Sequence, residues 1–381
     1  MVEFSDILYG KVTLPDWLQP FLRVPEFVRL RGVRLSNVDS FQFKDFSGPS
    51  RWEHCVAVAF LAIRCAEKRR ISERELVHLS LAALLHDVAT PPFAHTMEYV
   101  LQSFSHELES QRLLKAVPAG DTSPDFPVFA SQLPRFRQVC EKVSRQIGIA
   151  IDPDEVARLV VGEGDLGFLL NGTLDLDNAD NVTRASLHLG IEVDRHVPLG
   201  VADWLASQDG APLNLREIGE DAVIKWLSYR TKMYQAFFES SDEELGRQAF
   251  LQHLCRRALS EGVTRRQLIW NTDDGFLSLL ESADWETDVQ KRAALTNLVQ
   301  RYRLLEPLFK IAEIPVEDEE TLRVLKSPRA ARWIENELVG TAFEPFVLVN
   351  SRRYEAKEPQ ESLFPPAPGA VLVFKLGQVT K

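Results

Sequence analysis

The sequence predicts a mainly α fold with a small β-type segment near its C-terminal end. From residue 51 to about residue 310, apolar residues recur at helical spacing in segments that loops rich in proline and glycine separate. From about residue 340 the pattern changes, because Phe346–Val349 and Ala370–Phe374 are short runs rich in β-branched and aromatic residues. We therefore expect packed helices for most of the chain, followed by a small β appendage of one hairpin.

The composition limits the classes of protein that the chain can belong to. Hydrophobic residues make up 45% of the 381 residues and charged residues 26%, which is ordinary for a soluble globular protein with a large core. The net charge of −11 disfavours polyanionic nucleic acid as a main partner. A small nucleotide could still enter a locally basic pocket, so the charge does not exclude a nucleotide ligand.

The cysteines and the N-terminal residues indicate the compartment. The four cysteines are too few and too scattered for a disulfide framework, and we expect Cys55 and Cys65 to be reduced core residues of one helix. The N-terminal residues lack a basic region followed by an apolar one, and no apolar run approaches the roughly 18 residues that span a bilayer. We therefore expect a cytoplasmic protein with no membrane partner.

The first helices can be placed from their caps and their breakers. Prolines divide residues 1–50 into short helical turns and loops, and a helix is expected from Arg51 to Lys68 with His54 in its first turn. Ser72 precedes two acidic residues, as an N-cap does, and begins a second helix that ends at about residue 87.

Paired prolines end this second helix in a loop at 88–92, and a third helix is expected at about 94–115. A surface loop at about 116–130 follows it. Further helical segments are expected at about 134–147, 153–161, 176–188 and 215–310. We expect four parts, an N-terminal segment packed on the core, a metal-site core, a helical extension and a β-type segment, at residues 1–50, 51–191, 192–340 and 341–381.

Two histidines and two aspartates have the pattern of a metal-ligand set. His86 and Asp87 are adjacent at the end of an apolar helical run, His54 lies on the preceding helix, and an aspartate follows far downstream. Imidazole and carboxylate groups both bind divalent metals, and four such ligands leave positions for water and a substrate oxygen. The ligand set accepts one Mn, Fe, Zn, Co, Ni or Mg ion. A capping or core histidine is the alternative for His54 taken alone, and Asp175 and Asp180 compete with Asp177 for the last position.

Several further motifs occur around these residues, in a fixed order between about residues 6 and 191. They are Asp6–Gly10 (D-x-I-x-G), Val24–Arg31 (like T-P-x-F-Q-R-L-R), Arg51–His54 (like R-F-E-H), Pro91–Glu98 (P-P-F-x-H-x-x-E), His106–Ser110 (H-E-x-x-S) and Asp175–Asp180 (D-x-D-x-x-D). The set resembles the HD-domain phosphohydrolases, in particular the branch of deoxynucleoside triphosphate triphosphohydrolases. The resemblance implies the helical HD fold, Asp177 as the fourth ligand, and a homo-oligomer.

The candidate acid–base groups are His95, Glu98 and His106. If they lie on one helix they share a face, because the first two are one turn apart and the outer two about three turns apart. Such groups next to a metal loop could position water and protonate a leaving oxygen, with the glutamate orienting a histidine. The resemblance favours this role, because the matching His and Glu of bacterial dGTPases are catalytic. A solvated polar face is the alternative.

Substrate contacts are expected from arginines and from polar residues near the ligands. Arg51 lies one turn before His54 and could hold a phosphate oxygen through its planar guanidinium. Arg184 lies four residues after Asp180, so a structural salt bridge between them is an equal alternative to substrate contact. The candidate substrate-binding residues are Arg51, Asp180, Arg184, Arg230 and Tyr234.

The sequence departs from the family pattern where the family reads the sugar. Asn181 replaces an aromatic residue, and Ala185 replaces a carboxylate that would accept a hydrogen bond from a sugar hydroxyl. Thr90 stands where the family has His or Asn. We therefore expect a metal-dependent hydrolase of (deoxy)nucleoside triphosphates with altered sugar recognition. The alternatives are a hydrolase for a nucleoside monophosphate or a cyclic or signalling nucleotide, and a non-catalytic HD module that binds nucleotide.

Overall fold

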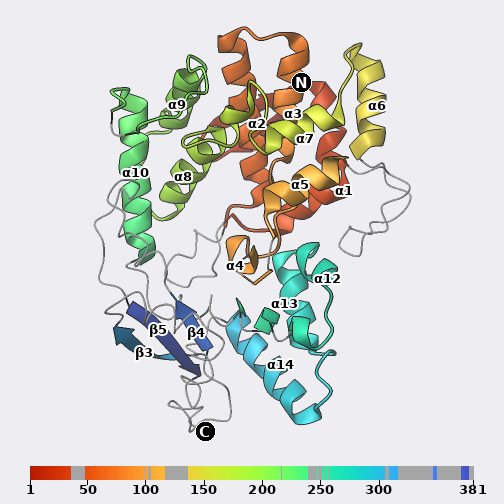
Figure 1. The fold of residues 1–381 in the computed structure, drawn as a ribbon, viewed down its shortest axis with the longest axis vertical. Helices are drawn as coiled ribbons and strands as arrows, with labels where there is room; N and C mark the ends of the chain where they lie inside the picture. The colour runs from red at the N-terminus through yellow and green to blue at the C-terminus, as the bar shows by residue number, and fades with distance from the viewer. Residues whose placement is uncertain are drawn as a thin grey trace. The chain divides into compact units, whose positions relative to one another are not determined.

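The chain is seen here in a computed structural model (Figure 1). It describes residues 1–35, 48–98, 100–101, 104–115, 136–215, 217–238, 247, 251–252, 254–256, 258–304, 309–315, 346–349 and 370–376. The chain divides into two units, of which the first contains Met1–Asn37, Gln42–Tyr234 and Val263–Ser278, and the second the remaining segments. The mainly α fold class is confirmed, whereas the four-part division expected from the sequence stays a prediction.

Helices α2 (Arg51–Arg69) and α3 (Glu73–Leu85) pack against each other in the first unit. Each begins with a capping box, in which Ser50 and Ser72 accept from the backbone N–H three residues on and a glutamate at that position reaches back. Helix α2 ends at Arg70, which has a left-handed φ of 54°. The expected N-cap at Ser72 is therefore confirmed, and His86 is the C-cap of α3.

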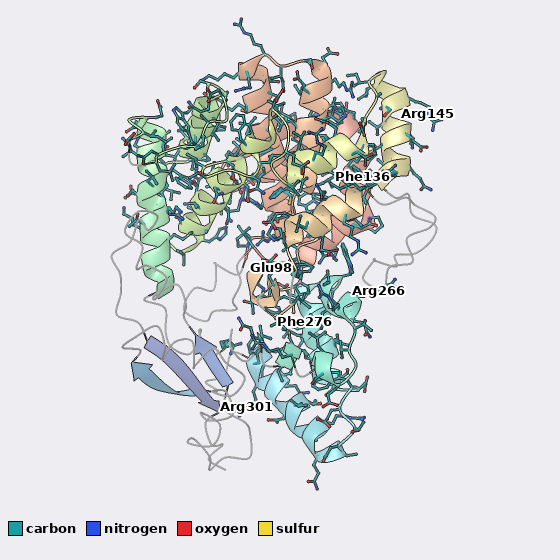
Figure 2. The ribbon with its side chains drawn as sticks, viewed as in Figure 1. Glu98, Phe136, Arg145, Arg266, Phe276 and Arg301 are labelled. Atoms are coloured by element: carbon teal, nitrogen blue, oxygen red, sulfur yellow. The ribbon has the colours of Figure 1, made fainter. Side chains whose placement is uncertain are left out.

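The other helices of the first unit surround this pair. Helices α8 and α9 pack on α2 and on each other, and α7 packs on α3 and α5. Phe136 of α6 contacts Phe21 with a ring separation of 5.8 Å (Figure 2). The bounds are α5 (His106–Lys115), α6 (Phe136–Ile147), α7 (Pro153–Val160), α8 (Leu176–His188), α9 (Val197–Leu205), α10 (Asp221–Phe238), α12 (Arg265–Ile269) and α13 (Asp273–Ser282). Helices α10 and α13 both continue into the second unit.

The N-terminal residues differ from the expectation. Instead of helical turns alone, β1 (Val2–Asp6) and β2 (Gly10–Leu14) form an antiparallel hairpin. Asp6 Oδ1 closes its turn by accepting the N–H groups of Leu8 (2.7 Å) and Tyr9 (3.0 Å). The expected short helical turns follow only after the hairpin, as η1 (Asp16–Leu18), η2 (Phe21–Arg23), α1 (Pro25–Val28) and η3 (Arg29–Gly32).

The single helix expected at 94–115 is wrong. The chain forms α4 (His95–Glu98) and then starts again with α5, because the Ser105 side chain accepts the N–H of Leu108 at 3.3 Å and so begins a new helix. Helix α9 lies between the segments expected to be helical and was not predicted. The loop expected at 116–130 lies outside the described residues.

The second unit contains α14 (Val289–Arg303) and a three-stranded antiparallel sheet. Its strands, in the order β3–β5–β4, are β3 (Phe309–Pro315), β5 (Ala370–Leu376) and β4 (Phe346–Val349). The two expected β-type runs are therefore adjacent strands, but β3 corrects the prediction twice, because it adds a third strand and lies in a range expected to be helical. Among the residues that the structure describes, every helix is too short or too polar to cross a membrane.

Candidate metal centre

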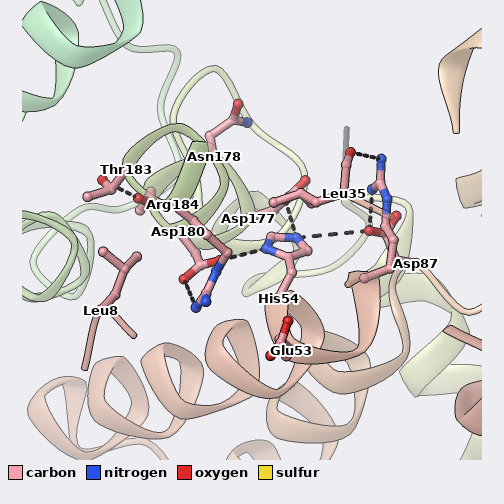
Figure 3. A network of polar contacts seen from close by, with 12 residues as sticks. Leu8, Leu35, Glu53, His54, Asp87, Asp177, Asn178, Asp180, Thr183 and Arg184 are labelled. Carbon is pink, nitrogen blue, oxygen red and sulfur yellow. Dashed lines mark hydrogen bonds and ion pairs between the residues drawn. The ribbon is translucent and has the colours of Figure 1, made fainter. Parts of the chain in front are cut away.

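His54 lies in the first turn of α2 and is completely buried, with 0% of its surface exposed (Figure 3). Its Nδ1 is 2.7 Å from Oδ2 of Asp180, and its Nε2 is 2.8 Å from Oδ1 of Asp177. A carboxylate can only accept a hydrogen bond, so Nδ1 carries a hydrogen toward Asp180. The Nε2 lone pair is then directed at the space that Asp177 also faces, as in a metal-binding imidazole.

His86 is the C-cap of α3, and its ring is oriented by the backbone. Its Nδ1 lies 2.8 Å from the carbonyl oxygen of Ala83, which can only accept, so Nε2 is left for a ligand. This Nε2 lies 3.6 Å from Oδ2 of Asp87 and 3.7 Å from Oδ1 of Asp177. The two imidazoles thus direct their Nε2 atoms at the same pair of carboxylates.

The donor atoms fit a divalent metal ion. Nε2 of His54, Nε2 of His86 and Oδ1 of Asp177 are buried, and no hydrogen-bond partner exists for them among the described residues. A buried polar atom without a partner is costly, and two electron-rich atoms at 2.8 Å, Nε2 of His54 and Oδ1 of Asp177, need a proton or a cation between them. Atoms that bind one ion at about 2.1 Å lie about 3.0 to 3.4 Å apart, which is close to the separations in this cluster. The ligand atoms of His54, His86 and Asp87 all lie within 4.8 Å of one another.

Protonation of His54 reflects the negative charge collected at this cluster. Burial lowers the pKa of His54, but the carboxylates of Asp177 and Asp180 outweigh burial and raise the pKa to about 9. The same carboxylates favour a divalent cation, which competes with protons for the imidazoles.

Asp87 is oriented by three neighbours. Its Oδ2 accepts from Nη1 of Arg51 at 2.5 Å, and its Oδ1 accepts from the Thr90 hydroxyl at 2.9 Å and lies 3.2 Å from Nε2 of His106. Burial raises the pKa of Asp87, but the positive charge of Arg51 and the neighbouring histidines hold it well below its usual range. Arg51, expected to bind a phosphate, is thus engaged with a ligand and with the Leu35 carbonyl (3.4 Å).

Asp180 and Arg184 form a buried network behind His54. Asp180 accepts from the hydroxyl of Tyr9 at 2.8 Å and from Nε and Nη2 of Arg184, both at 2.9 Å. Nη2 of Arg184 also donates to Oδ2 of Asp6 at 2.9 Å. Both residues are almost fully buried, at 0% and 1% exposure, so the structure places them where they orient His54, and the salt bridge named as the alternative for Arg184 is present.

The three competing aspartates have distinct positions. Asp175 is the N-cap of α8 and accepts the N–H groups of Asn178 (2.7 Å) and Gly172 (2.9 Å). Burial and the charge of Asp177 raise the pKa of Asp175 to about 7. Asp177 alone faces both imidazoles, and its side chain is 30% exposed. Asp177 is therefore the one of the three that is placed beside both imidazoles, and its role as the ligand stays a prediction.

The expected pairing of a glutamate with a histidine occurs between Glu98 and His106. Oε1 of Glu98 accepts from the backbone N–H of His106 at 3.1 Å and lies 2.5 Å from its Nδ1. Burial lowers the pKa of His106, but hydrogen bonds with Asp87 and Glu98 raise it to about 10. His95 begins α4, and its side chain lies outside the described residues.

Two other expected substrate contacts lie on α10. Arg230 is half-buried, whereas the side chain of Tyr234 is not among the described ones. Their contact with substrate stays a prediction.

The sequence reasoning missed Tyr9 as a contact of the site. In the sequence Asp6–Gly10 is recognisable only as a motif. The contact of Tyr9 in this hairpin turn with Asp180 of α8 depends on tertiary packing. Arg29 and Asp273 were also missed; both lie near the loop that follows Asp87.

Part of the chain matches a known protein family, and several known proteins are similar to it. Residues 51–132 match the family described as HD domain. An uncharacterized protein of Methanocaldococcus jannaschii is 23% identical over 334 residues, which cover 84% of this chain and 65% of the relative. The deoxynucleoside triphosphate triphosphohydrolase SAMHD1 homolog of Dictyostelium discoideum is 32% identical over 101 residues, or 25% of this chain and 20% of the relative. SAMHD1 of Mus musculus is 31% identical over 105 residues, or 26% and 16%.

A solved phosphohydrolase structure from Bacteroides thetaiotaomicron shares the fold, with a TM-score of 0.63, 15% identity and coverage of 99% of this chain and 100% of that one. The chain spans less than two thirds of the length of the curated relatives that it matches. Fold and site together define a helical domain built around a His/Asp cluster suited to a divalent metal. The chain carries an HD domain over residues 51–132 and is similar to HD-domain phosphohydrolases.

Proposed function

We propose that this protein is a metal-dependent phosphohydrolase that converts (deoxy)nucleoside triphosphates to nucleoside and triphosphate. One observation carries the proposal. Nε2 of His54, Nε2 of His86 and Oδ1 of Asp177 are buried without hydrogen-bond partners among the described residues, and they lie together beside the carboxylate of Asp87. The HD domain and the SAMHD1 relatives support a general phosphohydrolase role. The triphosphate substrate is the finer step, and it rests on the resemblance of the motifs.

The residues around the cluster suit the hydrolysis of a phosphoester. A divalent ion held by His54, His86, Asp87 and Asp177 would polarise a phosphoryl oxygen and acidify a bound water. His106, held by Glu98, is placed to hold a proton beside Asp87, and the leaving sugar oxygen requires one. The exposed part of Asp177 lets a substrate approach the cluster from solvent.

A second candidate function follows from helix α8. Ala185 is buried at 5% exposure, and its methyl side chain has no carboxylate that could accept a hydrogen bond from a sugar hydroxyl. This favours, as the alternative, hydrolysis of a nucleoside monophosphate or of a cyclic or signalling nucleotide. A non-catalytic module that binds nucleotide is disfavoured by the Glu98–His106 pair, because binding alone needs no oriented acid–base group.

Chromatography of a nucleotide panel tests these functions. The protein is incubated with Mn²⁺ and with dNTPs, NTPs, monophosphates and cyclic nucleotides. Nucleoside and intact triphosphate are expected. Nucleoside with single phosphate, or an opened cyclic nucleotide, would instead establish the alternative. If no nucleotide is converted while the metal is bound, the hydrolase proposal is wrong for these substrates.

Asp87→Ala is the matched control for contaminating activity. Loss of this ligand and of its contacts with Arg51 and Thr90 should abolish metal binding and lower turnover by about three orders of magnitude or more. Asp165→Ala, at an exposed carboxylate, should keep both. Full turnover of the Asp87 variant would contradict a metal-dependent mechanism.

We also expect a homo-oligomer, by resemblance to the family. Light scattering after size-exclusion chromatography tests this, and a monomer at every concentration and with every nucleotide would contradict it.

A further inference from the structure

A strained turn lies in the sequence between the candidate ligand Asp87 and the candidate acid–base residues Glu98 and His106. The N–H of Ala94 donates to the carbonyl of Pro91 at 3.0 Å, and Phe93 and Ala94 have φ angles of +54° and +45°. Glycine or asparagine is usual where φ is positive, and two successive L-residues in this region are held only when their surroundings enforce it. The turn follows Asp87 and leads directly into α4.

Asp273, at the start of α13, binds this turn. Its Oδ1 accepts the N–H of Phe93 at 2.9 Å, and its Oδ2 accepts the backbone N–H and Nε of Arg34 at 3.0 and 2.6 Å. The Arg34 guanidinium in turn lies 4.8 Å from the centre of the Phe93 ring. One buried carboxylate thus fixes both the backbone and, through Arg34, the side chain of Phe93.

Neighbouring residues strengthen the same connection. Arg29 donates to the carbonyls of Thr90 (2.7 Å), Val88 (3.2 Å) and Asn271 (2.8 Å). It therefore joins the loop after Asp87 to Asn271, which lies two residues before Asp273.

The approach of the two segments is close. A Cβ on Gly32 would lie 2.7 Å from Cγ2 of Thr272, so a larger residue would push them apart. The rings of Phe93 and Phe276 are 6.0 Å apart, and Figure 2 shows Phe276 in the same part of the first unit as Glu98.

We propose that Asp273 is a positioning residue for the hydrolytic reaction: it holds the Phe93–Ala94 turn so that α4 presents Glu98 to His106. Asp273 has no contact with the ligands, and its effect passes through the turn. Glu98 then fixes the Nδ1 side of His106 and leaves Nε2 3.2 Å from Oδ1 of Asp87. The inference rests on the proposed phosphohydrolase function.

Three variants test the role of Asp273. Asp273→Ala removes all three accepted hydrogen bonds, Asp273→Asn keeps an acceptor for Phe93 but loses the charge beside Arg34, and Asp274→Ala changes the exposed neighbour in the same turn of α13. KM is measured together with kcat, which is normalised to the concentration of metal-loaded, folded enzyme. Bound metal is measured by mass spectrometry. Because displacements of about 1 Å can cost roughly 100-fold in rate, we expect Asp273→Ala to lower kcat about 10- to 100-fold.

Under this proposal KM changes less than about threefold, metal content is unchanged, Asp273→Asn is intermediate and Asp274→Ala matches the wild type. If Asp273 only stabilised the fold, the yield of folded protein would fall while kcat per folded enzyme stayed constant, which would overturn the proposal. Loss of metal in Asp273→Ala would also overturn it, because the residue would then act on the ligands.

Ala94→Gly provides a rescue that a purely structural role would not show. Glycine adopts a positive φ without strain, so in the Asp273→Ala background it should recover about threefold or more of the lost kcat. No recovery would contradict the role of the turn.

Hydrogen exchange separates this inference from the proposed function. In Asp273→Ala the amides of Phe93, Ala94 and Met97 should exchange faster, while those of α2 and α3 are unchanged. A wild-type protein inactive on every nucleotide would refute the proposed function. Unchanged exchange at these amides would refute the positioning role, whatever the activity.

Discussion

The two imidazoles of the candidate metal centre are oriented by different means. His54 directs Nδ1 at the carboxylate of Asp180, which Arg184 and Tyr9 hold in turn, whereas His86 directs Nδ1 at the backbone carbonyl of Ala83. A carboxylate partner increases the basicity of an imidazole ligand more than a neutral carbonyl does. The α2 side of the centre is therefore adjustable by side-chain substitution, and the α3 side is fixed by the end of a helix.

This difference also decides how far each side extends through the fold. The network behind His54 reaches the turn of the N-terminal hairpin through Tyr9 and Asp6. The support of His86 is local, three residues back in the same helix. Substitutions behind His54 can therefore test the candidate metal site without changing a ligand, whereas among the described residues the Nδ1 of His86 contacts a backbone carbonyl and no such side chain.

The largest effect should come from removing either imidazole. His54→Ala and His86→Ala should each lose metal and lower turnover by about three orders of magnitude or more. The two should differ in stability, because His54→Ala also leaves buried Asp180 without one of its donors. A lost hydrogen bond to a buried charge costs about 1.5–3 kcal/mol, so we expect a lower Tm for the His54 variant.

Differential scanning fluorimetry of both variants in EDTA compares the folds without metal. Equal Tm values would show that the Asp180 network contributes nothing to His54, and the contrast between the two sides would fail.

A smaller effect is expected from Asp180→Asn. The amide keeps the shape but removes the negative charge behind His54, and loss of such a partner typically weakens metal binding about 10- to 100-fold. Asp203→Asn is the matched control, since it breaks an ion pair with Arg64 near the surface (2.8 Å) and should leave metal affinity unchanged. Competition with a fluorescent chelator measures the affinities, and equal values for wild type and Asp180→Asn would refute the role of the carboxylate.

The parts of this site that were predictable are those that local patterns fix. Ser72 with its acidic first turn placed α3, and the spacing of His54 from Arg51 placed it in a first helical turn. The choice among the three aspartates needed the resemblance, because a cap, a ligand and a supporting carboxylate are alike in sequence. The structure separates them by what each one contacts.

The rest depended on contacts between residues distant in the chain or on a local signal that was overlooked. The contacts of Tyr9 with Asp180 and of Phe93 with Asp273 join residues far apart in sequence, and no periodicity reports them. The break before α5 had a signal, because Ser105 followed by Glu107 and Glu109 is an N-cap pattern. The prediction of one helix across 94–115 overlooked this signal and was wrong.

The smallest effect on metal affinity is expected from Tyr9→Phe, which tests most finely the contrast between the supports of His54 and His86. The variant keeps the ring that packs 5.5 Å from Phe60 and removes only the hydroxyl that donates to Asp180. Because Arg184 and His54 still bind Asp180, we expect metal affinity to fall only about two- to tenfold, less than in Asp180→Asn. In the Asp180→Asn background the same change should have almost no further effect on affinity, since the two substitutions act through one carboxylate. Additive losses would show that the hairpin reaches the metal centre by another route.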